Sequence, residues 1–181
     1  MRLKKEQIYL FIIFAVVLIN YINIFQNQFA WDDYNFIVGN KKITSFSYVP
    51  YYFTHESMNS LWRPLRETFY IITYSMWGLN SFGYHLNAIL QHLFISILVF
   101  FIVEKIAKHK EIALFTALLF AAHPIHTERV TGMTASFDML GILLYLLGFF
   151  FFILYREKNS RKYFIYALNA YTLALLSSEE A

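Results

Sequence analysis

The sequence contains no cysteine, which excludes disulfide bonds and metal sites built on thiolate ligands. It is also poor in charge, since Asp, Glu, Lys and Arg make up only 15% of the residues, whereas an ordinary soluble domain has about a quarter. A glycine-rich phosphate-binding loop, a nucleophile elbow and an internal repeat are all absent. The chain therefore lacks the signatures of nucleotide hydrolases, serine hydrolases and repeat proteins.

Apolar and aromatic residues take the place of the missing charge. Of the 181 residues, 58% are hydrophobic and 20% are aromatic, with 20 Phe and 14 Tyr, and the mean hydropathy is +0.44. Such a composition suits helices that face lipid better than it suits the core of a water-soluble domain. The sequence therefore predicts an all-α integral membrane protein, and no nucleic-acid partner is expected.

Long apolar runs indicate where the chain crosses the membrane. The first run is flanked by Arg2, Lys4 and Lys5, as in a signal peptide, but it is too long and no small-residue cleavage site follows it. We therefore expect an uncleaved helix there. Two of the later runs are short, and a short helix can cross a bilayer when it tilts little and packs within a bundle. The five predicted spans are residues 8–25, 86–103, 112–122, 139–155 and 163–176.

The distribution of Lys and Arg predicts the orientation. With the N-terminus in the cytoplasm, the inner segments hold ten of these residues and the outer segments hold five. Positive residues concentrate on the cytoplasmic side of membrane proteins. We therefore expect a multi-pass protein of the bacterial inner membrane or the endoplasmic reticulum, with its N-terminus in the cytoplasm.

The predicted outer loop, residues 26–84, is much longer than a connection between two spans needs to be. Within it, residues 66–77 place Phe69, Ile72 and Met76 on one face of a helix. Aromatic residues in this stretch favour the headgroup level of a bilayer. The pattern predicts a helix that lies along the outer membrane interface.

Two adjacent carboxylates, Asp32 and Asp33, stand between Trp31 and Tyr34 soon after the first span. One interpretation is a solvated loop pair or a helix cap, because Asp is a common capping residue. The other is a general base or a metal-binding carboxylate at the rim of an outward-facing cavity. The dipeptide alone does not decide between them.

Two arginines flank Pro64 at the start of the predicted interfacial helix. Arg66 is interpreted as a snorkelling side chain that reaches lipid phosphate. Arg63 is held between Trp62 and Pro64, and its planar guanidinium suits bidentate binding of a phosphate. We therefore expect Arg63 to bind a lipid-linked phosphate.

Polar residues concentrate between two later spans, in the stretch His123 to Val130. A metal-site interpretation takes His123, His126 and Glu128 as ligands, but Pro124 breaks the regular helical spacing of the two histidines. A polar group of His123, His126, Glu128 and Arg129 that lines a substrate cavity is the better interpretation, because polar groups at this depth are usually functional.

Two further polar positions complete the candidate site. Asp138 lies at the start of the fourth span, where it can pair with Arg129 or another cation. His85 and His92 are seven residues apart on one face of the second span. His92 is interpreted as a packing residue, and His85 is kept as a candidate for the cavity lining.

Five segments in order carry a family resemblance: "WDD", "WRPL", "GLNSFGYHLNAILQH", "LLFAAHPIHTERVTGMTASFDML" and "LALLSSEEA". Together they resemble the N-terminal membrane region of the GT-C superfamily of glycosyltransferases. Within it, the most similar family is that of the transmembrane and tetratricopeptide-repeat O-mannosyltransferases and their bacterial relatives. The resemblance extends from Phe29 to the end of the chain.

The resemblance implies an enzyme that transfers a sugar from a polyprenyl-phosphate donor to a protein or glycan hydroxyl on the outer side of the bilayer. It implies that Asp32 or Asp33 acts either as the base or as the ligand of a divalent cation. It also implies that Arg63 meets the donor phosphate. The residues then expected to line the cavity are His123, His126, Glu128 and Asp138, to which His85 and Arg129 are added from the patterns above.

Two departures from the family pattern limit this inference. Where the family usually has Ser-Lys-Glu, this chain has Ser177, Ser178 and Glu179, so a basic contact is missing. Family members also continue with further spans and helical repeats, so we expect an N-terminal part whose helices do not complete the cavity. A transporter or flippase and a non-catalytic scaffold are the alternatives. The grouping of the acids and Arg63 outside the spans, on one face, favours the enzyme.

Overall fold

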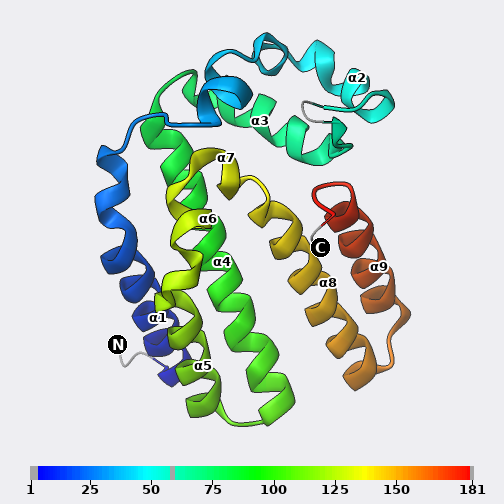
Figure 1. Ribbon diagram of the computed structural model, residues 1–181. Coiled ribbons are helices and arrows are strands. Elements are labelled where there is room, and N and C mark those ends of the chain that lie inside the picture. Colours follow the sequence, from blue (N-terminus) through cyan, green and yellow to red (C-terminus); the bar gives the residue numbers. More distant parts are fainter. Residues whose placement is uncertain (1–3, 58–59, 180–181) are drawn as a thin grey trace.

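The computed structural model describes residues 4–57 and 60–179, and all regular secondary structure in those ranges is helical. Five helices form a bundle, and a layer of shorter elements covers one end of it (Figure 1). The expected all-α fold is thus confirmed. The bundle helices are α1 (Lys5–Tyr21), α4 (Ser81–Ala107), α5 (Lys110–Ala122), α8 (Met139–Lys158) and α9 (Arg161–Leu175).

Three helical stretches are long and apolar enough to cross a membrane: Lys5–Gln26, Ser81–Ala107 and Met133–Lys158. The first includes α1 and the 3₁₀ turn η1 (Ile22–Gln26) that follows it. The helices α5 and α9 have 13 and 15 residues, which corresponds to about 20 Å each, whereas the hydrocarbon core is about 30 Å thick. Five helices thus match the five predicted runs, and the number that crosses the membrane stays a prediction.

Small side chains allow α5 to approach its neighbours closely. Ala113, Ala117 and Ala121 recur every four residues along one face of α5, and all three are fully buried. They pack in one apolar cluster with Ile13 of α1 and Phe100 of α4. Close contact of helices through small residues is the usual packing mode within membranes.

The backbones of α8 and α9 also approach each other closely in the hairpin that these helices form. A Cβ atom added at Gly148 would lie 3.2 Å from the carbonyl oxygen of Ala167, and one added at Gly141 would lie 2.8 Å from Cβ of Ser178. The two backbones therefore pack against each other along most of their length. As a result, the residues after α9 are held close to the beginning of α8.

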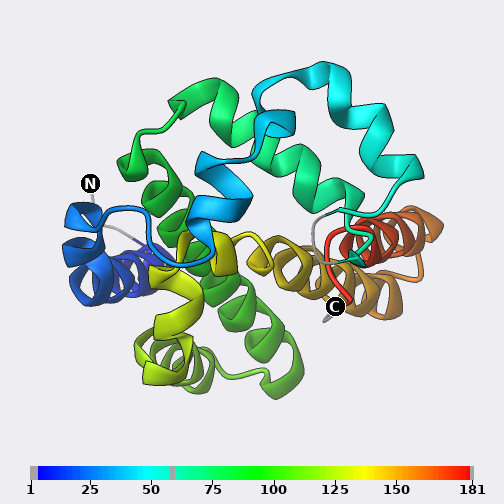
Figure 2. The same cartoon turned by 45° about the horizontal axis from the view of Figure 1, so that its top comes forward.

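The predicted outer segment forms the layer over one end of the bundle. Figure 2 shows the molecule with this layer turned toward the viewer. Its main helix is α3, and the predicted helix over residues 66–77 is confirmed with an earlier start. Proline is favoured in the first turn because its nitrogen needs no hydrogen bond there. The layer contains η2 (Tyr34–Val38), η3 (Lys41–Thr44), η4 (Phe46–Tyr48), α2 (Val49–Thr54) and α3 (Pro64–Trp77).

A second apolar core joins this layer to the bundle. Tyr70 of α3 is fully buried and stacks on Phe137, with 3.7 Å between the ring centroids. Ile72 and Met76 on the other face of α3 stay exposed. The backbone N–H of Leu65 also donates to the carbonyl of Leu176, at 3.0 Å, so the start of α3 is bound to the chain just after α9.

The polar stretch between α5 and α8 forms three short turns. It contains η6 (Pro124–His126), α6 (Thr127–Thr131) and α7 (Met133–Ser136). Pro124 follows directly after the end of α5, in agreement with the expectation that a helix ends there. The turns α6 and α7 lie beneath the outer layer (Figure 1).

Candidate functional site

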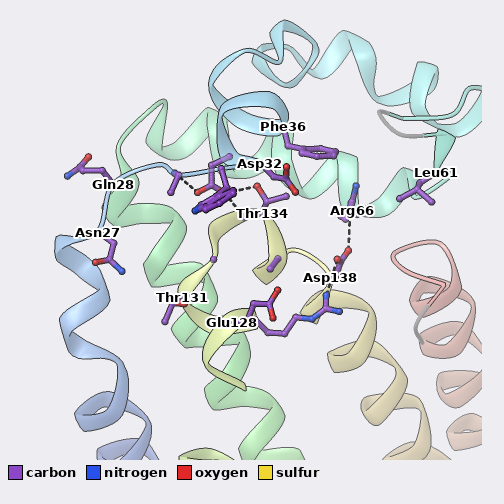
Figure 3. Close-up of a pocket in the computed structure, with 16 residues that line it drawn as sticks. Asn27, Gln28, Asp32, Phe36, Leu61, Arg66, Glu128, Thr131, Thr134 and Asp138 are labelled. Atoms are coloured by element: carbon purple, nitrogen blue, oxygen red, sulfur yellow. Dashed lines mark hydrogen bonds and ion pairs between the residues drawn. The ribbon is translucent and has the colours of Figure 1, made fainter. Parts of the chain in front are cut away.

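A cavity of about 870 Å³ lies between the outer layer and the turns α6 and α7. Its walls come from segments far apart in the sequence, as Figure 3 shows. Asp32 projects from the upper wall in that view and Glu128 from the lower wall, with Arg66 and Asp138 to one side. The lining residues are Asn27, Gln28, Ala30, Trp31, Asp32, Asp33, Phe36, Leu61, Arg66, Glu128, Arg129, Thr131, Gly132, Thr134, Ala135 and Asp138.

The two adjacent carboxylates of the first outer turn have different surroundings. Asp33 is buried, and its Oδ1 accepts hydrogen bonds from the backbone N–H of Thr134 at 2.9 Å and from the Thr134 hydroxyl at 2.6 Å. Its Oδ2 accepts from the backbone N–H of Ala30 at 3.0 Å. Asp33 therefore binds the turn to α7.

Asp32, in contrast, is exposed and lines the cavity. Its carboxylate accepts no hydrogen bond from any residue within 4–57 and 60–179. A general base must have a lone pair available for the proton that it removes. Of the two acids, Asp32 is therefore the one whose carboxylate is available for chemistry.

Asp138 is the centre of an arginine cluster. Its Oδ1 accepts from Nη1 of Arg63 at 2.7 Å and from Nη1 of Arg66 at 3.0 Å, and its Oδ2 accepts from Nη1 of Arg129 at 3.1 Å. The three guanidinium groups come from the residue before α3, from α3 and from α6. One buried carboxylate thus joins three separate segments through charge-assisted hydrogen bonds.

Two more acids balance the charge of this cluster. Glu179 accepts from Nε and Nη2 of Arg63, and Glu67 accepts from Nη2 of Arg66 at 3.2 Å. The hydrogen bonds from Arg63 lower the pKa of Glu179 below its usual value, and burial raises the pKa of Glu67. Carboxylates thus occupy guanidinium donors of Arg63 and Arg66, so a phosphate that binds there must compete with them.

Arg63 does not line the cavity. It is buried, and it is held by Asp138 on one side and Glu179 on the other. The guanidinium groups that do line the cavity are those of Arg66 and Arg129. The interpretation of Arg66 as a lipid-facing, snorkelling side chain is wrong, because only 3% of its surface is exposed.

The histidines lie outside the cavity lining. The ring of His126 packs against Phe120, with 4.3 Å between the centroids, and against His92 of α4, and His123 contacts the ring of His126. His85 is fully buried in α4, and neither ring nitrogen has a hydrogen-bond partner in the part of the chain that the structure describes. The cavity thus combines five of the nine predicted residues: Asp32, Asp33, Glu128, Arg129 and Asp138.

Metal binding by the protein alone has no support in the geometry. Within residues 4–57 and 60–179, no group of three or more His, Asp or Glu side chains lies close enough together to hold a metal ion. Of the four acids that line the cavity, Asp33 and Asp138 accept hydrogen bonds from protein groups, which leaves Asp32 and Glu128 as the candidate carboxylate ligands. A Mg²⁺ ion bound there would need further ligands from water and from a substrate phosphate.

The sequence-based site omitted several residues that the cavity contains. Thr134 carries no motif, and its role depends on contact with Asp33, which lies 101 residues earlier in the chain. The position of Arg66 could have indicated that it belongs to the site, since it lies three residues after Arg63 and both are near the start of one helix. Three other lining residues lie shortly before the acid pair in the sequence: Asn27, Gln28 and Trp31. Only this proximity indicated that they belong to the cavity.

Comparisons with known proteins show which family the chain is similar to. A family profile described as "Dolichyl-phosphate-mannose-protein mannosyltransferase" matches residues 64–181. The chain is 37% identical over 89 residues, 49% of its length, to Protein O-mannosyl-transferase TMTC1 of Homo sapiens. It is 30% identical over 169 residues, 80% of its length, to Protein O-mannosyl-transferase TMTC4 of Homo sapiens, and 27% identical over 144 residues, 75% of its length, to Tmtc1 of Drosophila melanogaster.

These relatives are much longer than the chain. The matched regions cover 10% of human TMTC1, 17% of the Drosophila protein and 23% of human TMTC4. No solved structure matches the chain.

Proposed function

The chain belongs to the dolichyl-phosphate-mannose-protein mannosyltransferase family, and from this premise we propose that the protein transfers a mannosyl or similar sugar. The donor is a polyprenyl-phosphate-linked sugar, and the acceptor is a hydroxyl group of a protein or glycan. The transfer takes place on the extracytoplasmic side of a bacterial inner membrane or of the endoplasmic reticulum.

One observation carries the proposal: an available carboxylate and two guanidinium groups line the same cavity. Asp32 lies on one wall, and Arg66 lies beside Asp138 (Figure 3), to which Arg129 also donates a hydrogen bond. Transfer from a lipid phosphate needs a base for the acceptor and positive charge for the leaving phosphate. The cavity offers both.

The proposed reaction is a single displacement of the phosphate at the anomeric carbon. Asp32 removes the proton of the acceptor hydroxyl, and the oxygen attacks the anomeric carbon of the donor sugar. The bond between that carbon and the phosphate oxygen breaks, and the phosphate leaves with the bonding electrons. Because attack and departure take place on opposite faces of the carbon, the anomeric configuration is inverted.

The leaving phosphate is met by Arg66 and Arg129, and Arg63 acts through Asp138. Since Asp138 holds all three guanidinium groups, a phosphate competes with this carboxylate for the hydrogen-bond donors of the two cavity-lining arginines. Arg63, which does not line the cavity, helps to keep Asp138 in place through its hydrogen bond to Oδ1. A divalent cation at Asp32 would supply additional charge, and no step above depends on it.

The sidedness of the cavity can be tested directly, because the chain has no cysteine of its own. Single cysteines at the exposed positions Asn35, beside the acid pair, and Lys108, at the other end of the bundle, are matched probes. We expect Asn35→Cys to react with a membrane-impermeant maleimide in intact cells, and Lys108→Cys to react only after permeabilisation. The reverse pattern would overturn the proposed orientation.

The activity test uses a polyprenyl-phosphate mannose donor with a radiolabelled sugar and measures its transfer to acceptor protein. We expect transfer by the protein and a fall of about 100-fold to 10,000-fold for Asp32→Asn, the range typical of a general base. Equal turnover by the variant would eliminate Asp32 as the base. Absence of transfer from every polyprenyl-phosphate sugar would eliminate the proposed function.

A further inference from the structure

Trp31 is an exposed aromatic side chain at the mouth of the cavity, directly before Asp32. Its side chain and backbone together are 93% exposed, more than any other large hydrophobic residue in the described part of the chain. It lines the cavity, and it makes no ring or cation contact with another described residue. A single exposed apolar side chain is common on a protein surface, and what distinguishes Trp31 is that its exposed ring lines the cavity beside Asp32.

The backbone at Trp31 is strained, and the strain is held by its neighbours. Its φ angle is +51°, in the left-handed region that a bulky residue rarely adopts. The Asp33 carboxylate fixes the turn through Ala30 and Thr134, and the carbonyl of Trp31 accepts from the backbone N–H of Tyr34 at 3.3 Å. Strain that surrounding contacts maintain in this way is typical of functional turns.

A membrane anchor is the simplest alternative, since Trp is enriched at the membrane interface. Trp62 fits that role, because it is 49% exposed on the same outer layer and lies outside the cavity lining. Trp31 differs from it in two respects: it lines the cavity, and its backbone has a positive φ. An anchor needs neither feature.

The groups around Trp31 are those that recognise a sugar ring. The exposed amides of Asn27 and Gln28 and the carboxylates of Asp32 and Glu128 line the same cavity. Amides donate hydrogen bonds to vicinal hydroxyl groups and accept hydrogen bonds from them, and carboxylates accept hydrogen bonds from them. The face of an indole carries partial negative charge, which attracts the weakly positive C–H groups on one side of a pyranose.

We propose that Trp31 is a stacking platform for the pyranose ring of the transferred sugar, with the amides of Asn27 and Gln28 at its edge. This inference rests on the proposed function and adds the residue that holds the sugar beside the base. The strained turn presents Trp31 and Asp32 as neighbours, so stacking on the indole brings the anomeric carbon into the region of the Asp32 carboxylate. Trp31 thus belongs to donor binding and not to membrane anchoring.

The test compares three variants of the protein in the transfer assay: Trp31→Ala, Trp31→Phe and Trp62→Ala. We expect kcat/KM for the donor to fall about fivefold to tenfold in Trp31→Ala, mainly through KM, since stacking is lost in both ground and transition states. Trp31→Phe keeps an aromatic face and should stay within about twofold of the wild type. Trp62→Ala should leave kcat/KM unchanged. Equal values for Trp31→Ala and the wild type, or equal losses in Trp31→Ala and Trp62→Ala, would overturn the assignment.

A binding measurement separates this inference from the proposed function because it requires no turnover. Acrylamide quenching of tryptophan fluorescence is recorded with and without methyl α-D-mannopyranoside, and the signal of Trp31 is obtained by difference from the Trp31→Phe variant. The glycoside should protect Trp31, and open-chain mannitol should not. Lack of protection by the glycoside would overturn the stacking platform, whereas protection in a protein that transfers no sugar would overturn only the proposed function.

Discussion

Arg63 and Asp138, 75 residues apart in the sequence, form a buried ion pair with 2.7 Å between Nη1 and Oδ1. Arg63 precedes α3 in the outer layer, and Asp138 precedes α8 in the bundle. The pair therefore joins the two layers beside the cavity. Because Asp138 also binds Arg66 and Arg129, its carboxylate sets the position of every guanidinium in the cluster.

Replacing Asp138 by Asn should be strongly destabilising. The substitution removes the negative charge that three arginines share, and breaking a buried ion pair in this way costs about 3–5 kcal/mol. The thermal unfolding of the detergent-solubilised protein measures the change. Glu128→Gln is the matched control, since Glu128 is exposed and lines the same cavity, and it should alter stability by less than about 0.5 kcal/mol. Equal unfolding midpoints for the two variants would contradict the role given to Asp138.

The substitutions Asp32→Asn and Asp33→Asn should affect different properties, the first the transfer activity and the second the stability. Asp32→Asn should retain wild-type stability and lose transfer activity, because its carboxylate binds no other described residue. Asp33→Asn should lose about 1–3 kcal/mol of stability, since it weakens three hydrogen bonds to Ala30 and Thr134. Thermal unfolding and transfer rates measured on the same preparations separate the two effects. A stability loss confined to Asp32→Asn would reverse the assignment.

Thr134 offers a milder test of the same turn. Thr134→Val keeps the shape of the side chain and removes the hydroxyl that donates to Asp33 at 2.6 Å, which should cost about 1–2 kcal/mol. Activity should fall as well, because the turn carrying Asp32 loosens. Thr134→Ser restores the hydroxyl and should recover both properties. If valine and serine behave alike in unfolding and transfer, the hydroxyl has no part in holding the turn.

The pair of Glu179 and Arg63 predicts a pH dependence of stability. The hydrogen bonds from Arg63 lower the pKa of Glu179 from its ordinary value of 4.5 in the folded protein. A lowered carboxyl pKa stabilises the folded state fully above 4.5, and the contribution is lost as pH falls through the lowered folded value. The difference in stability between the wild type and Glu179→Gln should therefore be constant at neutral pH and vanish in strong acid. If this difference in stability stays the same in strong acid, the ionised pair of Glu179 and Arg63 is not its cause.

The sequence predicted the helices well because their signal is local. Apolar runs predicted α1, α4 and α8, and Pro124 correctly marked the end of α5. The helix α3 was also predicted from residues 66–77. Burial of an apolar face and the conformational preference of proline are properties of short stretches, so they can be recognised without tertiary structure.

The site was less predictable because its contacts are distant in sequence. The division of labour between Asp32 and Asp33 depends on the positive φ of Trp31 and on Thr134, neither of which the local sequence indicates. Arg66 was assigned to lipid because an arginine near an interface usually snorkels. Its burial depends on Asp138, which lies 72 residues further along the chain.

The glycines of α8 have a mechanical consequence for this site. Since Gly141 and Gly148 let α8 and α9 pack backbone to backbone, the two helices form one closely packed hairpin. Asp138 stands before its first residue and Glu179 stands just after its last, and both hold Arg63. Both ends of the hairpin thus meet at one guanidinium, so a substitution that separates α8 from α9 also separates the two carboxylates that hold Arg63.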